Sequence, residues 1–217
     1  MHAVQAVVGM SESELTPEEQ ERADGYALVA ALLQPPEPRW LARLAAAPAS
    51  GDPPWDALVR AARAGPERIA DEYARLFVAT GNPLLQPYQC WYLAGCLMDK
   101  PLAALRQDLR MLGITRAEGV HELEDHLAAL CETMHLLVRR GDAERQRWFF
   151  GRHLASWYCA CLHDVREAPG ADFYRAAAAL AESFLAAEAE QLAPEVQPVA
   201  RNIDREPRNH EHEALAS

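Results

Sequence analysis

Three carboxylates and one imidazole fall within five residues of this chain, at Glu122-Leu-Glu-Asp-His126. Paired carboxylates can share acid and base roles in catalysis, and an imidazole titrates near neutral pH. No nucleophile or cofactor motif lies nearby, so this stretch alone does not predict an enzyme. A simpler interpretation is a charge cluster at the start of a helix, where acidic groups suit the positive end of the helix dipole.

A second group of reactive residue types occurs at Cys159-Ala-Cys161-Leu-His163. On a helix Cys159 and His163 share one face, whereas Cys161 points about 200° away from Cys159. One metal ion could not bind all three side chains without breaking the helix, so we interpret the cysteines as small buried thiols and expect no metal site. The five cysteines are an odd number without framework spacing, which is typical of reduced thiols in a cytoplasmic protein.

Other common functional motifs do not occur. The chain has no Walker-type phosphate loop, no GxGxxG turn and no GxSxG elbow, so we expect no nucleotide, dinucleotide or other cofactor. The formal net charge of -11 argues against non-specific binding of nucleic acid. No apolar run reaches the roughly 18 residues of a transmembrane helix, and the first ten residues lack the basic region of a secretory signal.

The apolar residues after the acidic stretch predict the helix that positions it. Leucine, cysteine, methionine and valine residues recur there at steps of three and four, which places them on one stripe of a helix from about 123 to 140. These residues are Leu123, Leu127, Leu130, Cys131, Met134, Leu137 and Val138. Asp125 and His126 would lie in the first turn, beside the stripe.

The rest of the chain shows further helical patterns separated by Pro and Gly. Thr16-Pro-Glu-Glu19 has the form of a capping box with proline at the first helical position. A long helical stretch at 143–165 is divided in two around Gly151, and Asp172 is the expected cap of the last helix. No stretch alternates apolar and polar residues as a strand would. We therefore predict an all-α fold, a bundle of about eight to ten helices.

The same patterns divide the chain into three parts. Residues 1–15 are expected to form a flexible arm, and residues 16–193 a single all-helical domain with a hinge near 100–121. Residues 194–217 are polar and without an apolar stripe, so we expect a disordered tail.

Several separated segments together resemble the TorD/DmsD/NarJ-type chaperones, and most closely their TorD-like branch. The segments are Tyr73-Ala-Arg-Leu-Phe77 with Gly81, Pro87-Tyr-Gln-Cys90, Glu122-Leu-Glu-Asp-His126, Phe149-Phe150 with His153, Leu154 and Trp157, and Phe173-Tyr174. The chain departs from the family pattern at Leu123, which replaces a proline, at Cys90, which replaces a serine, and at Gln89, where Glu or Gly is common.

This resemblance implies a cytoplasmic, all-helical protein that is not an enzyme. Such chaperones bind the N-terminal leader of a molybdopterin-dependent oxidoreductase subunit, often a twin-arginine leader, and hold it for cofactor insertion before export. The implied partners are that signal peptide and the apo catalytic subunit, of a DMSO-reductase-type enzyme or a formate dehydrogenase. The implied oligomeric state is a monomer or a domain-swapped dimer. Weak guanine-nucleotide binding, proposed for some members, finds no support in these residues.

The resemblance and the residue chemistry together predict a leader-binding site. A groove lined by Leu84, Leu85, Pro87, Tyr88, Trp91 and the 123–140 helix would take the apolar part of the leader. Glu122, Glu124 and Asp125 would meet its arginines through charge-assisted hydrogen bonds. His126 would titrate near neutral pH or orient the loop. For Tyr73 the favoured interpretation is core packing.

Two other hypotheses stay open. The first is a NarJ-like assembly factor that acts on the core of a reductase without a twin-arginine leader. The second is an enzyme or metal protein that uses the Cys and His residues. The leader of the client would test the first, and elemental analysis of the purified protein would test the second.

Overall fold

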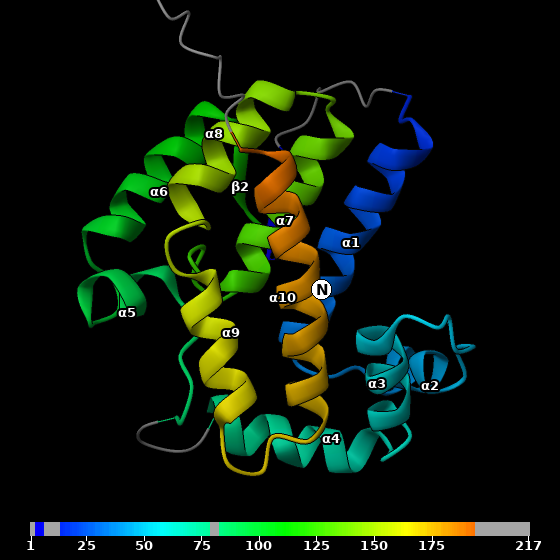
Figure 1. Cartoon of the computed structure of the whole chain (residues 1–217). Helices are drawn as coiled ribbons and strands as arrows, with labels where there is room; N and C mark the ends of the chain where they lie inside the picture. Colours follow the sequence, from blue (N-terminus) through cyan, green and yellow to red (C-terminus); the bar gives the residue numbers. More distant parts are fainter. Residues whose placement is uncertain (1–2, 7–13, 79–82, 194–217) are drawn as a thin grey trace, which may run out of the picture.

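The computed structural model describes residues 3–6, 14–78 and 83–193, and these are predominantly helical (Figure 1). The described residues form ten α-helices, which confirms the predicted all-α fold. The helices are α1 (Pro17–Leu33), α2 (Pro38–Ala45), α3 (Pro53–Ala62), α4 (Pro66–Tyr73), α5 (Gln89–Ala94), α6 (Lys100–Met111), α7 (Leu127–Arg139), α8 (Ala143–His153), α9 (Tyr158–Glu167) and α10 (Phe173–Gln191). A π-helical turn, η1 (Ala74–Val78), continues α4.

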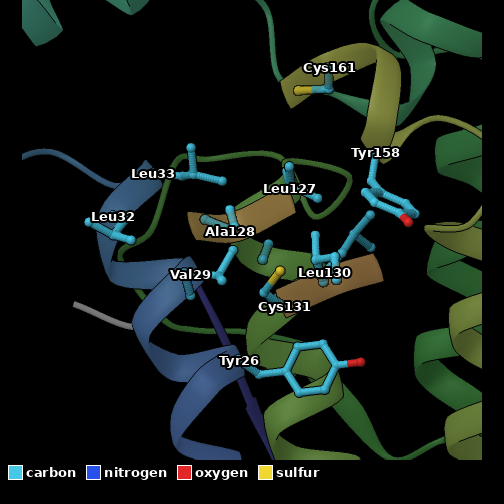
Figure 2. Close-up of a cluster of buried hydrophobic side chains, with 14 of the residues drawn as sticks. Tyr26, Val29, Leu32, Leu33, Leu127, Ala128, Leu130, Cys131, Tyr158 and Cys161 are labelled. Atoms are coloured by element: carbon cyan, nitrogen blue, oxygen red, sulfur yellow. The ribbon is translucent and has the colours of Figure 1, made fainter. Parts of the chain in front are cut away.

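Helices α1 and α7 pack against each other, and α10 packs against α1, α3 and α9 (Figure 1). The predicted stripe of α7 is buried from Leu127 to Val138, while Leu123 precedes the helix and is half-buried. Figure 2 shows Tyr26 and Val29 of α1 beside Leu130 and Cys131 of α7. The shared core of these two helices fixes where the start of α7 lies.

The start of α1 forms as the sequence predicts. The Thr16 hydroxyl accepts a hydrogen bond from the Glu19 N–H (3.2 Å), and the Glu19 carboxylate accepts one from the Thr16 N–H (2.9 Å). Pro17 occupies the first turn without needing the N–H that it lacks. The helix ends at Leu33, just before two prolines.

Two short strands depart from the sequence prediction. Strand β1 (Val4–Ala6) pairs antiparallel with β2 (Ile114–Arg116), so the expectation of a loose arm is wrong for these residues. Strands of three residues are too short to show an alternating pattern, and their partners lie more than a hundred residues apart in the chain. The expected tail at 194–217 lies outside the described residues.

The division of the 143–165 stretch also differs from the prediction. Gly151 lies inside α8, and the helix breaks instead at residues 154–157. Trp157 adopts a non-helical backbone there, and its indole N–H donates to the carbonyl of His153 (2.7 Å). A buried tryptophan therefore shapes this corner, without the glycine or proline that a sequence pattern would reveal.

The cap of α10 comes from a distant helix rather than from Asp172, whose side chain makes no capping bond. The buried carboxylate of Glu72, on α4, accepts hydrogen bonds from the N–H groups of Asp172 (2.9 Å), Phe173 (3.1 Å) and Tyr174 (2.9 Å). This contact satisfies donors that a helix start would otherwise leave unpaired.

Candidate functional site

The acidic loop before α7 is joined to the loop before α5 through the backbone. The N–H of Leu127 donates to the carbonyl of Pro87 (2.8 Å), and the N–H of Gln89 donates to the carbonyl of Asp125 (2.9 Å). Tyr88 and His126 face each other as an isolated antiparallel bridge. Two segments far apart in the sequence therefore form one rigid corner.

Asp125 lies inside this corner, with a side chain that is 0% exposed. Its Oδ2 accepts a hydrogen bond from the N–H of Cys90 (3.0 Å), in the first turn of α5. Its Oδ1 has no hydrogen-bond partner among the described residues. The carboxyl thus ties the start of α5 to the loop of α7, and it is shielded from any molecule at the surface.

His126 caps α7 rather than lying in its first turn. Its Nδ1 accepts a hydrogen bond from the N–H of Ala128 (3.1 Å), so the neutral ring carries its proton on Nε2. The ring packs edge-on against Tyr88, with centroids 5.1 Å apart. Burial lowers the pKa of His126 and outweighs the opposite effect of Glu122 and Asp125. The lowered pKa favours the neutral imidazole at neutral pH.

Glu122 is half-buried at the mouth of the corner. Its Oε1 accepts hydrogen bonds from the hydroxyl of Tyr88 (2.6 Å) and the N–H of Leu123 (3.1 Å). Burial and the bond to Glu122 raise the pKa of Tyr88, so the phenol stays a donor to this carboxylate. Both bonds end on Oε1, so Oε2 has no hydrogen-bond partner in the described part of the chain.

Glu124 has a different environment from its neighbours. Arg106 donates to its Oε2 from both Nε (3.1 Å) and Nη2 (2.9 Å), and forms an ion pair. Burial raises the pKa of Glu124, but the hydrogen bonds from Arg106 and its own backbone outweigh that effect and lower the pKa overall. The charge of Glu124 is therefore matched within the protein.

A hollow of about 410 Å³ opens beside this corner. Its walls come from the end of α1, from Tyr73, from residues 119–122 and from the start of α7, and Glu122 and His126 are among the residues that line it. The walls are mainly apolar, with Leu33, Pro35 and Val120 among them. The hollow can therefore hold an apolar group next to a carboxylate that has one unused oxygen.

The model of the family described as "Nitrate reductase delta subunit" matches residues 14–163 of the chain. The chain belongs to this family. It is a member of the NarJ/TorD type, as the sequence motifs predicted.

The chain is also similar to a named chaperone and to a solved structure. The chaperone protein TorD from strains of Vibrio cholerae serotype O1 is 27% identical over 129 residues, which cover 54% of this chain and 59% of the relative. The match therefore spans little more than half of each protein. A crystal structure of a candidate redox enzyme maturation protein from Archaeoglobus fulgidus is 16% identical, with a TM-score of 0.56, and covers 84% of this chain and 99% of that one. That likeness shows the shared fold.

In this NarJ/TorD-type chain, the structure separates the residues predicted to form one site. Glu122 and His126 line the hollow, and Pro87 and Tyr88 hold the corner behind them. The direct contacts with arginine predicted for Asp125 and Glu124 do not fit this geometry, because Asp125 is buried and Glu124 is paired with Arg106.

The apolar residues predicted to line the groove differ in their exposure to solvent. Leu85 belongs to the core and is 8% exposed, whereas Leu84 is 58% exposed and Trp91 is 39% exposed. None of these three side chains lines the hollow. The predicted groove around them is therefore not the hollow that the structure forms at Glu122.

Sequence reasoning missed two contributions to the site. Tyr73, assigned to core packing, lines the hollow, and burial, with a further effect of Glu122, raises its pKa to about 12. A buried network also braces α5: Gln89 contacts the ring of His153 (3.5 Å), which pairs with Asp108 (2.9 Å). The motif around Phe149 marked His153, but no local spacing signals its pairing with Asp108 on α6.

The Cys and His residues at 159–163 lie as the helix period predicts. Cys161 is buried, whereas Cys159 and His163 are exposed. Among the described residues no group of three or more His, Cys, Asp or Glu side chains is placed to hold a metal ion. No helix of the described ranges is long and apolar enough to cross a membrane.

Proposed function

We propose that this protein is a maturation chaperone that binds the N-terminal leader of a molybdopterin-dependent oxidoreductase subunit. It holds the apo subunit in the cytoplasm until the cofactor is inserted, before export. Membership of the NarJ/TorD-type family supports this role, as does the similarity to a protein named as the TorD chaperone. The role requires binding and release, and no catalytic turnover.

The observation that carries the proposal is the carboxylate of Glu122 at the edge of an apolar hollow. A twin-arginine leader presents cations followed by an apolar helix. The guanidinium of an arginine can donate to the unused Oε2 of Glu122 through a charge-assisted hydrogen bond. The apolar residues that follow fit beside Leu33 and Val120, as in other helix-in-groove complexes.

Roles follow for the neighbouring residues. His126 and Tyr88 orient Glu122 and the start of α7, because one caps the helix and the other donates to the carboxylate. Asp125 and Pro87 hold the two loops together from behind. These four are positioning residues, and Glu122 is the residue that contacts the leader.

The proposal is tested by recovery of the partner from native cells. Tagged protein is isolated from the cytoplasm under conditions in which molybdoenzymes are made, and bound proteins are identified by mass spectrometry. We expect a molybdopterin-dependent catalytic subunit that still carries its leader, and less of it with the Glu122→Gln variant. Recovery of no such subunit would contradict the proposal.

A second candidate function is supported by an exposed apolar stretch. Residues 93–98 are all exposed, and they include Leu93, Leu97 and Met98, the last being 73% exposed. Such a surface suits contact with a folded partner, as in a NarJ-like assembly factor that acts on a reductase core without a twin-arginine leader. Binding of a client from which the leader has been removed would favour this function over the first.

A further inference from the structure

Strand β1 is held by a buried carboxylate as well as by strand pairing. The N–H groups of Ala3 (2.5 Å) and Val4 (3.0 Å) both donate to Oε2 of Glu132, on α7. The N–H of Ala117 donates to the carbonyl of Ala3 (2.9 Å), next to the β2 residues in the ladder. Val4 is buried against the core, and its neighbour Gln5 is exposed. This surface therefore takes an extended backbone with small apolar side chains.

The place that β1 occupies adjoins the hollow at Glu122. A second hollow, of about 530 Å³, is lined by β1, by small residues of α1 and by Glu132. The two hollows share Gln34 and Val120 in their walls. Gln34 also donates to Glu132, so the same side chain joins the β1 anchor to the first hollow.

The apolar segment of a leader is longer than the hollow at Glu122 can hold, so the adjacent second hollow matters for leader binding. An apolar helix of about twelve residues is roughly 18 Å long. The hollow of about 410 Å³ at Glu122 lies at the small end of the range that encloses a drug-sized ligand. The apolar part of a bound leader would therefore extend into the second hollow, where β1 forms one wall.

We infer that the strip formed by β2 and Glu132 is a second peptide-binding subsite, and that Ala3–Ala6 is an internal competitor for it. This inference rests on the proposed leader-binding function. The end of the leader's apolar segment, in an extended conformation, displaces β1 from Glu132 and β2 and takes its place along the second hollow. The free protein thus keeps this surface covered, and only a peptide that also engages Glu122 uncovers it.

The geometry suits a reversible competitor. A two-stranded ladder of three residues is marginally stable by itself, so displacement of β1 leaves the helical core intact. Because β1 belongs to the same chain, its effective concentration at the strip is high, and only a ligand with additional contacts displaces it. The apparent affinity of the leader is reduced by the fraction of molecules in which β1 is released.

The test uses the full chain and a labelled probe peptide, Arg-Arg followed by about twelve alanine and leucine residues. The variant Gln5→Pro removes an N–H and fixes a backbone angle in β1, which weakens its ladder with Thr115. Gln5→Ala is the matched control, because the side chain at position 5 is exposed. Titration by fluorescence anisotropy gives the dissociation constants. Hydrogen exchange of the Val4 amide, which donates to Glu132, reports whether β1 is in place.

We expect Gln5→Pro to bind the probe roughly tenfold more tightly than the wild type, as for a strand in place about nine-tenths of the time. Gln5→Ala should bind like the wild type, and saturating probe should remove the protection of the Val4 amide. Equal affinities, or retained protection in the wild-type complex, would overturn the competitor and leave leader binding standing. Failure of every variant to bind the probe would overturn both.

Discussion

The carboxyl of Asp125 holds two loops together from a position without contact with solvent. Its neighbour Glu124 is paired with Arg106, and Glu122 alone among the three acidic residues lines the hollow. The three acidic residues thus have different roles. Asp125 joins two loops, Glu124 forms an ion pair, and Glu122 is the candidate contact for a ligand. At the residue scale, single substitutions should show which of these residues affects stability and which affects leader binding.

Asp125→Ala should lower the stability of the fold. The N–H of Cys90 would lose its partner inside the protein, which costs about 1–3 kcal/mol. Asp125→Asn is the control, since its amide oxygen can still accept that bond. Urea denaturation followed by circular dichroism measures both. A fully stable Asp125→Ala that no longer binds the leader would instead indicate direct contact.

His126 should make stability depend on pH in a defined direction. Burial lowers the pKa of His126 below its ordinary 6.5, so the unfolded chain takes up a proton at higher pH than the folded protein does. The free energy of unfolding therefore falls as the pH drops below 6.5 towards the folded-state pKa. His126→Asn keeps an acceptor for the N–H of Ala128 and cannot titrate.

Denaturation of both proteins between about pH 7 and pH 5 gives the comparison. The Asn variant should lose less stability over this interval than the wild type. It should not become independent of pH, because burial also lowers the pKa of His153, despite its bond to Asp108. Identical losses in the two proteins would show that His126 does not resist protonation in the fold.

At the element scale, two helix starts are completed by residues distant in the chain. Asp125 supports α5, and Glu72 supports α10 across about one hundred residues. The capping box of α1 is local by contrast, because its residues Thr16 and Glu19 lie three positions apart. Local caps stabilise single helices, whereas distant caps also fix how two helices lie against each other.

Glu72→Ala should destabilise the protein by about 2–3 kcal/mol, because three N–H groups at the start of α10 lose a charged acceptor. Asp172→Ala is the control, since this residue makes no capping bond and its contact with Arg68 is exposed. Thermal denaturation of the two variants compares them. Equal effects would mean that Asp172 caps α10 after all.

The local and distant caps also explain what the sequence could predict. The capping box at Thr16 and the stripe from Leu127 to Val138 are visible in the sequence, because they depend on neighbours three or four positions away. The motifs also identified the loops around Tyr88 and His126. The different roles of Glu122, Glu124 and Asp125 depend on the ion pair with Arg106 and on burial, and no local sequence pattern shows either. Strand β1 was missed for the same reason.

At the scale of the whole molecule, the net charge of -11 attracts cationic peptides before they reach the hollow. Steering of this kind acts on the association rate and is screened by salt. We expect the association rate constant of an arginine-containing leader to fall several-fold between about 0.05 M and 0.5 M salt. Stopped-flow fluorescence measures it, and a rate that does not change with salt would contradict electrostatic steering.

The central claim is that Glu122 binds the cations of a leader, and Glu122→Gln tests it most directly. The glutamine can still accept the bond from Tyr88, so the corner is retained while the charge is lost. Glu21→Gln is the control, because it removes the same charge from an exposed residue that lines neither hollow.

Isothermal titration with the client leader compares these two variants with the wild type. Loss of a charge-assisted bond worth about 1.5–3 kcal/mol predicts binding roughly ten- to a hundredfold weaker for Glu122→Gln, and unchanged for Glu21→Gln. Wild-type affinity in a folded Glu122→Gln variant would contradict the account.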